Sequence, residues 1–279
     1  IGGTLNMTYL ALRFSRYVNG VALLHEQVSE SMFPGYPIDA VTNGVHAPTW
    51  VSGPFSELFD RHIPNWPRSP QYMRYALGIP RSEIRKAHAE AKAELLVEVQ
   101  LRTGRELNPD VFTIGFARRA TAYKRAALFF SDLERLRRIV RSGRPMQVVL
   151  AGLAHPNDVG GQDMIRAVFR AAEELGEELP VCYLEGYNMA LARFMISGVD
   201  LWLNTPLKPH EASGTSGMKA ALNGVPSFSV VDGWWYEGLL EGITGWGIGP
   251  VGRDGESDEQ LERADMYDKL ENTILPLFY

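Results

Sequence analysis

The sequence has few of the features that would point to redox, membrane or nucleic-acid chemistry. Its 279 residues include one cysteine, Cys182, which excludes an internal disulfide and a cysteine-rich metal site and fits a reducing compartment. No run of about 18 apolar residues occurs, and no basic-then-apolar signal pattern opens the chain. The net charge of −5 gives no reason to expect a nucleic-acid or membrane partner. We expect a soluble, cytoplasmic protein.

Two further patterns are absent. The six histidines show no metal-ligand spacing, so we predict no metal site. The fingerprint G-x-G-x-x-G follows none of the predicted strands, which argues against a dehydrogenase.

From residue 111 onward, short apolar runs alternate with helical patterns. We predict strands at 111–116, 147–152, 181–185, 199–203 and 227–231, and helices at 125–141, 162–175, 189–196 and 216–222. This alternation predicts an α/β fold with a Rossmann-like, doubly wound parallel sheet that is buried on both faces. In such a sheet, ligands bind beyond the carboxyl ends of the strands.

The first hundred residues are predicted to be mainly helical. Apolar side chains at three- and four-residue steps predict one helix over residues 6–31. Residues 54–80 are rich in proline and aromatic residues and predict short helices and loops. A long helix is predicted over 82–103, with Ser82 as its cap, Gly104 at its end and a solvated charged face.

The segment H-E-A-S-G-T-S-G-M-K at 210–219 is a loop of small residues that turns into a helix. Thr215 or Ser216 is expected to cap this helix, and Asn223-Gly224 to end it. Free backbone N–H groups at a helix start suit an anion, and the amine of Lys219 and the carboxylate of Glu211 can converge there. Such loops are common, so a binding site and a solvated lysine both remain open.

Two other strand ends carry candidate residues. Four cations, Arg118, Arg119, Lys124 and Arg125, follow the first predicted strand. They fit either an anion site, because arginine offers a planar fork and lysine a point charge, or a solvated helix start. An aromatic cluster at 234–236 follows the last predicted strand and fits either sugar stacking or core packing.

Several of these segments resemble motifs of the α-glucan phosphorylases, the glycogen, starch and maltodextrin phosphorylase family. E-A-S-G-T-S-G-M-K-A-A-L-N-G at 211–224 resembles the family's cofactor-lysine segment. R-A-T-A-Y-K-R at 119–125 resembles R-[IV]-x-x-Y-K-R, and E-G-Y-N at 185–188 resembles E-N-Y-[RN]. V-N-G-V-A-L-L-H at 18–25 and T-N-G-V at 42–45 resemble segments at the family's domain crossover. The resemblance spans nearly the whole chain, and Thr121-Ala122 matches the family's shorter bacterial or archaeal members.

The resemblance implies a role for each matching residue. Lys219 would carry pyridoxal 5′-phosphate as a Schiff base, with Thr215, Tyr187, Arg118 and Asn188 near the cofactor. Arg119 and Lys124 would hold the substrate phosphate, and the catalytic set would be Arg119, Lys124 and Lys219. The sugar would be bound by Glu211, Ala212, Ser213, Gly214 and Asn43. Long members have an arginine where this chain has Asn188.

The implied reaction is the reversible phosphorolysis of terminal α-1,4-linked glucosyl units to α-glucose 1-phosphate, with retained configuration. The partners would be an α-1,4-glucan, inorganic phosphate and glucose 1-phosphate, and a homo-oligomer remains open. Residues 1–42 would be the terminal helix of an N-terminal glucan-binding domain. Residues 43–279 would be the C-terminal cofactor- and phosphate-binding domain of a GT-B glycosyltransferase, incomplete at its end. We expect a fragment that is inactive without the missing N-terminal domain.

Two alternatives remain open. Glycogen and starch synthases, which use nucleotide sugars, resemble this region but carry a second glutamate eight positions after the first. Here that position (211 + 8) is Lys219, an amine that can form a Schiff base as a carboxylate cannot, which favours a phosphorylase. The other alternative is a carbohydrate-binding protein without catalytic activity.

Overall fold

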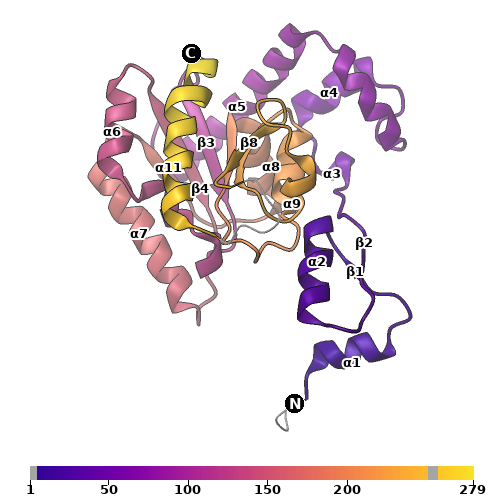
Figure 1. The fold of residues 1–279 in the computed structure, drawn as a ribbon. Coiled ribbons are helices and arrows are strands. Elements are labelled where there is room, and N and C mark those ends of the chain that lie inside the picture. The colour runs from indigo at the N-terminus through magenta and orange to yellow at the C-terminus, as the bar shows by residue number, and fades with distance from the viewer. Residues whose placement is uncertain (1–4, 251–256) are drawn as a thin grey trace.

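A six-stranded parallel sheet forms the centre of the computed structural model, which describes residues 5–250 and 257–279 (Figure 1). The strand order is β5-β4-β3-β6-β7-β8. The strands are β3 (Phe112–Ala117), β4 (Met146–Ala151), β5 (Val181–Leu184), β6 (Leu201–Asn204), β7 (Ser227–Val230) and β8 (Gly245–Ile248). The five predicted strands are confirmed, as is the doubly wound α/β fold. The sequence analysis missed β8, because its two glycines interrupt the apolar pattern that marks a strand.

Helices cover both faces of the sheet (Figure 1). One face packs on α6 (Leu133–Arg141), α7 (Val159–Leu175), α11 (Glu259–Lys269), the π-turn Leu270–Ile274 and α12 (Leu275–Phe278). The other face packs on α5 (Arg81–Thr103), α8 (Met189–Gly198) and α9 (Thr215–Ala221). The chain moves outward from β3 in one direction and from β6 in the other. The carboxyl ends of β3 and β6 therefore border the crevice in which ligands bind in doubly wound sheets.

The N-terminal segment differs from the prediction. The prediction of a single helix over 6–31 is wrong. The segment contains two helices, α1 (Met7–Phe14) and α2 (Leu23–Met32), which are separated by the short strand β1 (Asn19–Gly20). This strand pairs in parallel with β2 (Asp39–Ala40). A side chain at Gly20 would lie 2.7 Å from the backbone nitrogen of Glu26. The close approach explains the break, because only glycine fits there although the apolar spacing is helical.

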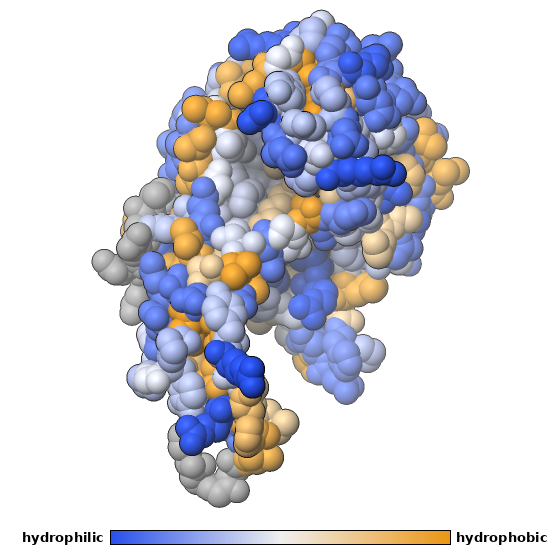
Figure 2. Space-filling model, turned by 90° about the vertical axis from the view of Figure 1, so that its right-hand side faces the viewer, coloured by the Kyte–Doolittle hydropathy of each residue, from blue (hydrophilic) through white to orange (hydrophobic). Residues whose placement is uncertain are grey.

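This N-terminal segment projects from the sheet and presents apolar side chains to solvent (Figures 1 and 2). Among its exposed residues are Leu5, Met7 and Phe14. It is tied to the rest of the chain by the carboxylate of Glu237 on α10 (Trp235–Gly238), which accepts hydrogen bonds from the backbone N–H of Leu23 (2.8 Å) and the hydroxyl of Thr42 (2.6 Å). The division into domains at 42/43 stays a prediction.

The segment between β2 and α5 forms the predicted short helices. They are α3 (Ala47–Trp50), α4 (Gly53–His62) and the 3₁₀ turn Pro70–Gly78, which enclose a small apolar core with the start of α5. Helix α5 ends at Gly104 as predicted, with a φ of 69°. Ser82 does not cap it, because the helix begins at Arg81 behind Pro80 and no side chain bonds to its first turn.

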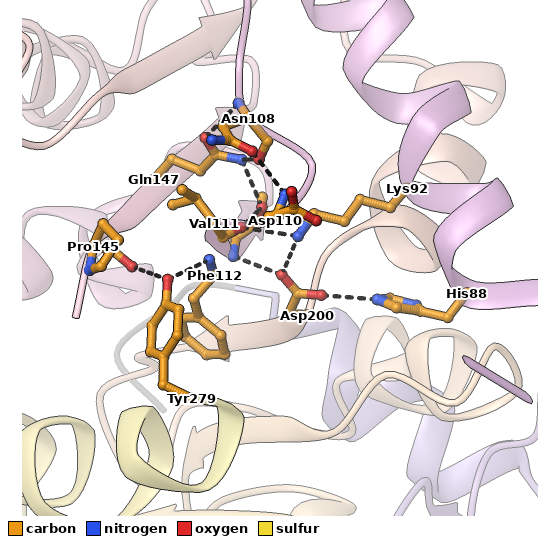
Figure 3. A network of polar contacts seen from close by, with 11 residues as sticks. His88, Lys92, Asn108, Asp110, Val111, Phe112, Pro145, Gln147, Asp200 and Tyr279 are labelled. Carbon is orange, nitrogen blue, oxygen red and sulfur yellow. Dashed lines mark hydrogen bonds and ion pairs between the residues drawn. The ribbon is translucent and has the colours of Figure 1, made fainter. Parts of the chain in front are cut away.

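The charged face of α5 is not wholly solvated as expected, because Lys92 is buried. Its Nζ donates to the carbonyl of Val111 (2.8 Å) and to Oδ2 of Asp200 (2.7 Å), as Figure 3 shows. The carboxylate of Asp200 also accepts the backbone N–H of Thr113 (2.7 Å) and lies 2.9 Å from Nε2 of His88. These contacts fasten α5 to the amino ends of β3 and β6, at the edge opposite the ligand crevice.

The helix predicted over 125–141 was also wrong at its start. Arg125 has a left-handed backbone (φ 45°) between the 3₁₀ turns Ala122–Lys124 and Ala126–Phe130. Helix α6 begins only at Leu133, where the carboxylate of Asp132 caps it by accepting the backbone N–H of Arg135 (2.9 Å). Of the described helices, none combines the length and apolar character needed to cross a membrane.

Candidate active site

The loop after β3 is locked to the loop after β6. The hydroxyl of Thr205 donates to the carbonyl of Lys124 (3.0 Å), and the backbone N–H of Leu207 donates to the carbonyl of Tyr123 (2.7 Å). The guanidinium of Arg125 donates to the carbonyl of Thr205 (3.1 Å) and forms a buried ion pair with Glu262 on α11. The side chain of Lys124 is thereby held at the crevice.

Arg118 and Lys124 converge on Glu211. Nη2 of Arg118 and Nζ of Lys124 both donate to Oε2 of Glu211. The three side chains are 8%, 8% and 11% exposed. The pKa of Glu211 is lowered, because Arg118 and Lys124 outweigh the burial that would raise it. All three residues follow the carboxyl ends of strands, the edge at which ligands were expected to bind, and their roles toward a ligand stay predictions.

Lys124 has the most strongly shifted pKa of these groups. Burial and the neighbouring charge of Arg118 lower it from 10.5 to about 8, although Glu211 opposes the shift. The amine is therefore a charge that titrates close to physiological pH. The charge of Arg119 also lowers the pKa of Lys124, so Arg119 lies near that amine. Its own side chain is exposed and makes no hydrogen bond or ion pair with a described residue.

A second loop holds Glu211 from behind. The carboxylate of Asp232, which is 3% exposed, accepts the backbone N–H of Glu211 on Oδ2 (2.9 Å) and that of Gly233 on Oδ1 (2.8 Å). The backbone N–H of Trp234 donates to the carbonyl of Ser213 (2.8 Å). Burial raises the pKa of Asp232. The sequence analysis did not assign Asp232 a role, although its position directly after a buried strand could have marked it.

A small pocket opens between these groups. Its walls include Arg118, Glu211, Ser213 and Asp232, together with Asn204, Pro206, Gly214, Ser229, Trp234 and Trp235. Three of its buried polar atoms, Nη1 of Arg118, Oγ of Ser213 and Nε1 of Trp235, have no hydrogen-bond partner among the described residues. Buried polar atoms are almost always paired, so these atoms are ready to bind polar groups of a ligand.

Helix α9 begins differently from the prediction. Thr215 and Ser216 do not cap it, because the preceding Gly214 takes a left-handed conformation (φ 88°) and Thr215 is already the first helical residue. The hydroxyl of Ser216 instead accepts a hydrogen bond from the indole of Trp202 (3.2 Å). The helix ends at Ala221 with Leu222 as its cap, slightly before the predicted stop at Asn223-Gly224, and Gly224 has the expected left-handed conformation (φ 69°).

The amine of Lys219 lies over an aromatic ring. Its Nζ is 3.8 Å from the centre of the Trp50 ring, and burial lowers its pKa. The amide of Asn223 donates to the carbonyls of both Trp50 and Lys219 (2.9 Å each) and so fixes α3 against α9. Among the described residues, no hydrogen bond or ion pair joins Lys219 to Glu211, so the convergence of these two side chains stays a prediction.

The remaining predicted residues lie around this edge. Tyr187 and Trp50 both pack against the apolar cluster under α5 and α8, and burial raises the pKa of Tyr187 while the nearby Arg118 opposes the shift. Asn188 caps α8 by accepting the backbone N–H of Leu191 (3.0 Å). Thr215 is half-buried and Asn43 exposed. The ligand contacts expected of them, and of Ala212, stay predictions.

The aromatic cluster after β7 contributes to packing, one of the two roles considered from sequence, and sugar stacking stays a prediction. Trp235 is 3% exposed and belongs to the core. Trp234 is half-buried and lies against Gly214 and Gly217. It therefore supports the loop that carries Glu211. Within the described part of the chain, no group of three or more histidine, cysteine, aspartate or glutamate residues could hold a metal ion.

Comparison with known proteins identifies a single family. The sequence model described as carbohydrate phosphorylase matches residues 2–237. A glycogen phosphorylase of Aquifex aeolicus is 39% identical over 98% of this chain and 43% of its own length. A maltodextrin phosphorylase of Thermococcus litoralis is 38% identical over 100% and 37%, and a glycogen phosphorylase of Mycobacterium tuberculosis 38% over 98% and 35%. The chain spans less than half the length of these curated relatives, and it belongs to the carbohydrate phosphorylase family.

Proposed function

We propose that this chain is the C-terminal part of an α-glucan phosphorylase. The complete protein would catalyse the reversible phosphorolysis of terminal α-1,4-glucosyl units to α-glucose 1-phosphate, with retained configuration. The observation that carries the proposal is the convergence of Arg118 and Lys124 on Glu211 at the carboxyl ends of β3 and β6. The names of the relatives, glycogen and maltodextrin phosphorylase, support the substrate class.

The cations at this edge suit inorganic phosphate. Arg118 and Arg119 lie close enough to Lys124 for their charges to lower its pKa. An incoming phosphate can take the unpaired Nη1 of Arg118, while the exposed Arg119 is free to turn toward it. Buried, preorganised cations stabilise developing negative charge better than solvated ones, because little reorganisation is needed during the reaction.

The opposite side of the pocket suits a sugar. Because its pKa is lowered, the carboxyl group of Glu211 is ionised at neutral pH. It can therefore accept hydrogen bonds from the hydroxyl groups of a sugar. The unpaired hydroxyl of Ser213 lies two residues further along the same loop. A glucosyl unit bound by Glu211 and Ser213 would lie next to the cations that suit phosphate, so that the two reactants would meet at this edge of the sheet.

The residues near Lys219 fit pyridoxal 5′-phosphate. When bound, this cofactor supplies its phosphate as an acid–base group beside the substrate phosphate. Lys219 would hold it, since burial lowers the pKa of the amine and so increases the unprotonated fraction needed for covalent attachment. Trp50 and Tyr187 offer an apolar wall for an aromatic ring, and Arg118 a cation for its phosphate. Thr215 and Asn188 complete the proposed cofactor contacts.

The wider organisation follows from the same proposal. Residues 1–42 would belong to the N-terminal glucan-binding domain and 43–279 to a C-terminal domain of GT-B type. The exposed apolar face of the N-terminal segment supports this division, because it would pack on that domain. We further propose a cytoplasmic enzyme whose glucan-binding wall, including any contact of Asn43, forms only in the complete protein.

The test uses the complete protein. We expect glucose 1-phosphate to form from maltodextrin and inorganic phosphate, and the protein to carry pyridoxal phosphate detectable by absorbance. Consumption of ADP- or UDP-glucose without phosphorolysis would instead assign a nucleotide-sugar glycosyltransferase. Binding of maltodextrin with neither activity would leave only a carbohydrate-binding role.

A further inference from the structure

We propose that Asp232 is a positioning residue for the sugar side of the site, and that it acts by fixing the backbone of Glu211. The inference rests on the proposed function, in which Glu211 binds the glucosyl unit. Asp232 itself lines the pocket, but its two carboxylate oxygens are occupied by the backbone N–H groups of Glu211 and Gly233. It therefore acts through the loop at 211–214.

Two hydrogen bonds and one close approach join the loop after β7 to the loop at 211–214. Asp232 holds the N–H of Glu211 at 2.9 Å, and the N–H of Trp234 holds the carbonyl of Ser213 at 2.8 Å. Between them Gly233 has a φ of 56°, and a side chain there would lie 2.5 Å from the carbonyl oxygen of Ser213. The two loops therefore fit together only with glycine at 233.

Asp232 fixes the backbone of Glu211, whereas Arg118 and Lys124 fix its carboxylate. A carboxylate that is held at its backbone can keep its position when a ligand draws the cations away. Without Asp232 the loop would follow the cations, and Glu211 would lose its alignment with the sugar. Misplacement by about 1 Å is enough to weaken binding and catalysis strongly.

Asp200 offers a matched control. It is also a buried carboxylate that accepts a backbone N–H, that of Thr113 at 2.7 Å, but it lies at the amino ends of the strands (Figure 3). A substitution there weakens the same kind of backbone contact, together with the ion pair to Lys92, without touching the ligand crevice. Comparing the two positions separates an effect on the site from an effect on the fold.

The experiment introduces Asp232→Asn and, separately, Asp200→Asn into the complete protein. Asparagine keeps the size of the side chain but replaces one acceptor oxygen with a donor that opposes an N–H. For Asp232→Asn we expect the KM for glucose 1-phosphate to rise about tenfold, the effect of losing one hydrogen bond to a charged group, with a smaller change in kcat. Asp200→Asn is expected to lower the Tm while leaving KM within about twofold.

A second measurement does not depend on activity. Amide hydrogen exchange of the peptide that contains Glu211 should be faster in Asp232→Asn than in the wild type, and unchanged in Asp200→Asn. Unchanged exchange together with an unchanged KM would overturn the proposal. If the wild-type protein lacks phosphorolysis, the proposed function fails, yet the exchange comparison still decides whether Asp232 fixes the loop.

Gly233→Ala covers the case in which Asp232→Asn does not fold. The added methyl group would clash with the carbonyl of Ser213 and push the loop after β7 away from the loop at 211–214. The Asp232 carboxylate remains, but its distance from the backbone N–H of Glu211 increases. We expect the same rise in KM and the same faster exchange. A Gly233→Ala protein with wild-type KM and exchange would contradict the inference.

Discussion

The ammonium of Lys219 lies 3.8 Å from the centre of the Trp50 ring, which belongs to a different part of the chain. Lys219 is on α9, beside the sheet, whereas Trp50 ends α3 in the helical region that precedes α5. The buried amide of Asn223 bonds to the carbonyls of both residues. The amine proposed to hold the cofactor is therefore positioned by two elements at once.

Replacing Trp50 should weaken cofactor binding without abolishing it. Trp50 is part of the apolar wall proposed for the cofactor ring, and an aromatic contact of this kind contributes about 0.5–1.5 kcal/mol, so Trp50→Leu should raise the apparent Kd for pyridoxal phosphate by roughly 2- to 13-fold. Reconstitution of the cofactor-free complete protein, followed by absorbance, measures this. Trp50→Phe, which keeps a ring, should lie between the two. Equal affinity in Trp50→Leu and the wild type would show that the ring has no such role.

Replacing Lys219 should remove covalent attachment altogether. Lys219→Ala takes away the only group proposed to bond to the cofactor, so mass spectrometry after borohydride treatment should find no modified lysine. Lys86→Ala is a suitable control, because Lys86 is exposed on α5 and pairs only loosely with Glu90 (3.9 Å). A reduced adduct elsewhere in the Lys219→Ala chain would refute the assignment.

Phosphate binding should weaken above about pH 8. Burial and Arg118 lower the pKa of Lys124 to about 8, so its charge is lost on the alkaline side of that value, and KM for phosphate should rise there. Since folding lowers this pKa from 10.5, the unfolded chain binds more protons between about pH 8 and 10.5. The titration of Lys124 by itself therefore increases the free energy of unfolding as the pH rises through that window. A weaker binding of phosphate there cannot be caused by Lys124 destabilising the fold.

Lys124→Arg provides the check on this pH dependence. Arginine keeps its charge at every pH in the range, so the alkaline rise in KM should disappear in the activity that remains. A profile with the same alkaline limb in both proteins would assign the titration to another group.

The buried ion pair between Arg125 and Glu262 should contribute strongly to stability. The side chains are 9% and 2% exposed, so Glu262→Gln leaves a buried guanidinium whose remaining carboxylate partner is the exposed Glu259 at 3.8 Å. Breaking a buried pair in this way costs about 3–5 kcal/mol in the free energy of unfolding, measurable by urea titration. Glu177→Gln breaks the exposed pair with Arg105 and should change stability little. Similar losses in both variants would contradict this expectation.

The sheet was predictable because its strands are buried on both faces and form continuous apolar runs. The errors arose where a single residue overrides a periodic pattern. Gly20 approaches the backbone of Glu26 too closely for a continuous helix, and Arg125 takes a left-handed conformation inside a helical pattern. The short strand β8 was missed because glycines make up half of it.

The site was predictable to the level of strand ends. Parallel strands bring their carboxyl ends to one edge, so Arg118, Lys124 and Glu211 could be expected to meet. Contacts across long sequence separations could not be predicted in this way. Lys92 lies among charged residues on a helix, which is typical of a solvated face. Its ammonium is nevertheless buried, because it pairs with the carboxylate of Asp200, 108 positions away in the sequence. The role of Asp232 likewise depends on a backbone N–H 21 positions earlier.

The family match ends at residue 237, but the sheet does not. Beyond that position β8 pairs with β7, and Trp246, Met266 and Tyr267 pack into the main apolar core. A recombinant protein shortened to the matched region would leave β7 as an open edge and uncover that core. Such a version should aggregate on expression, so a recombinant protein that contains this sheet needs α11, the π-turn and α12 as well.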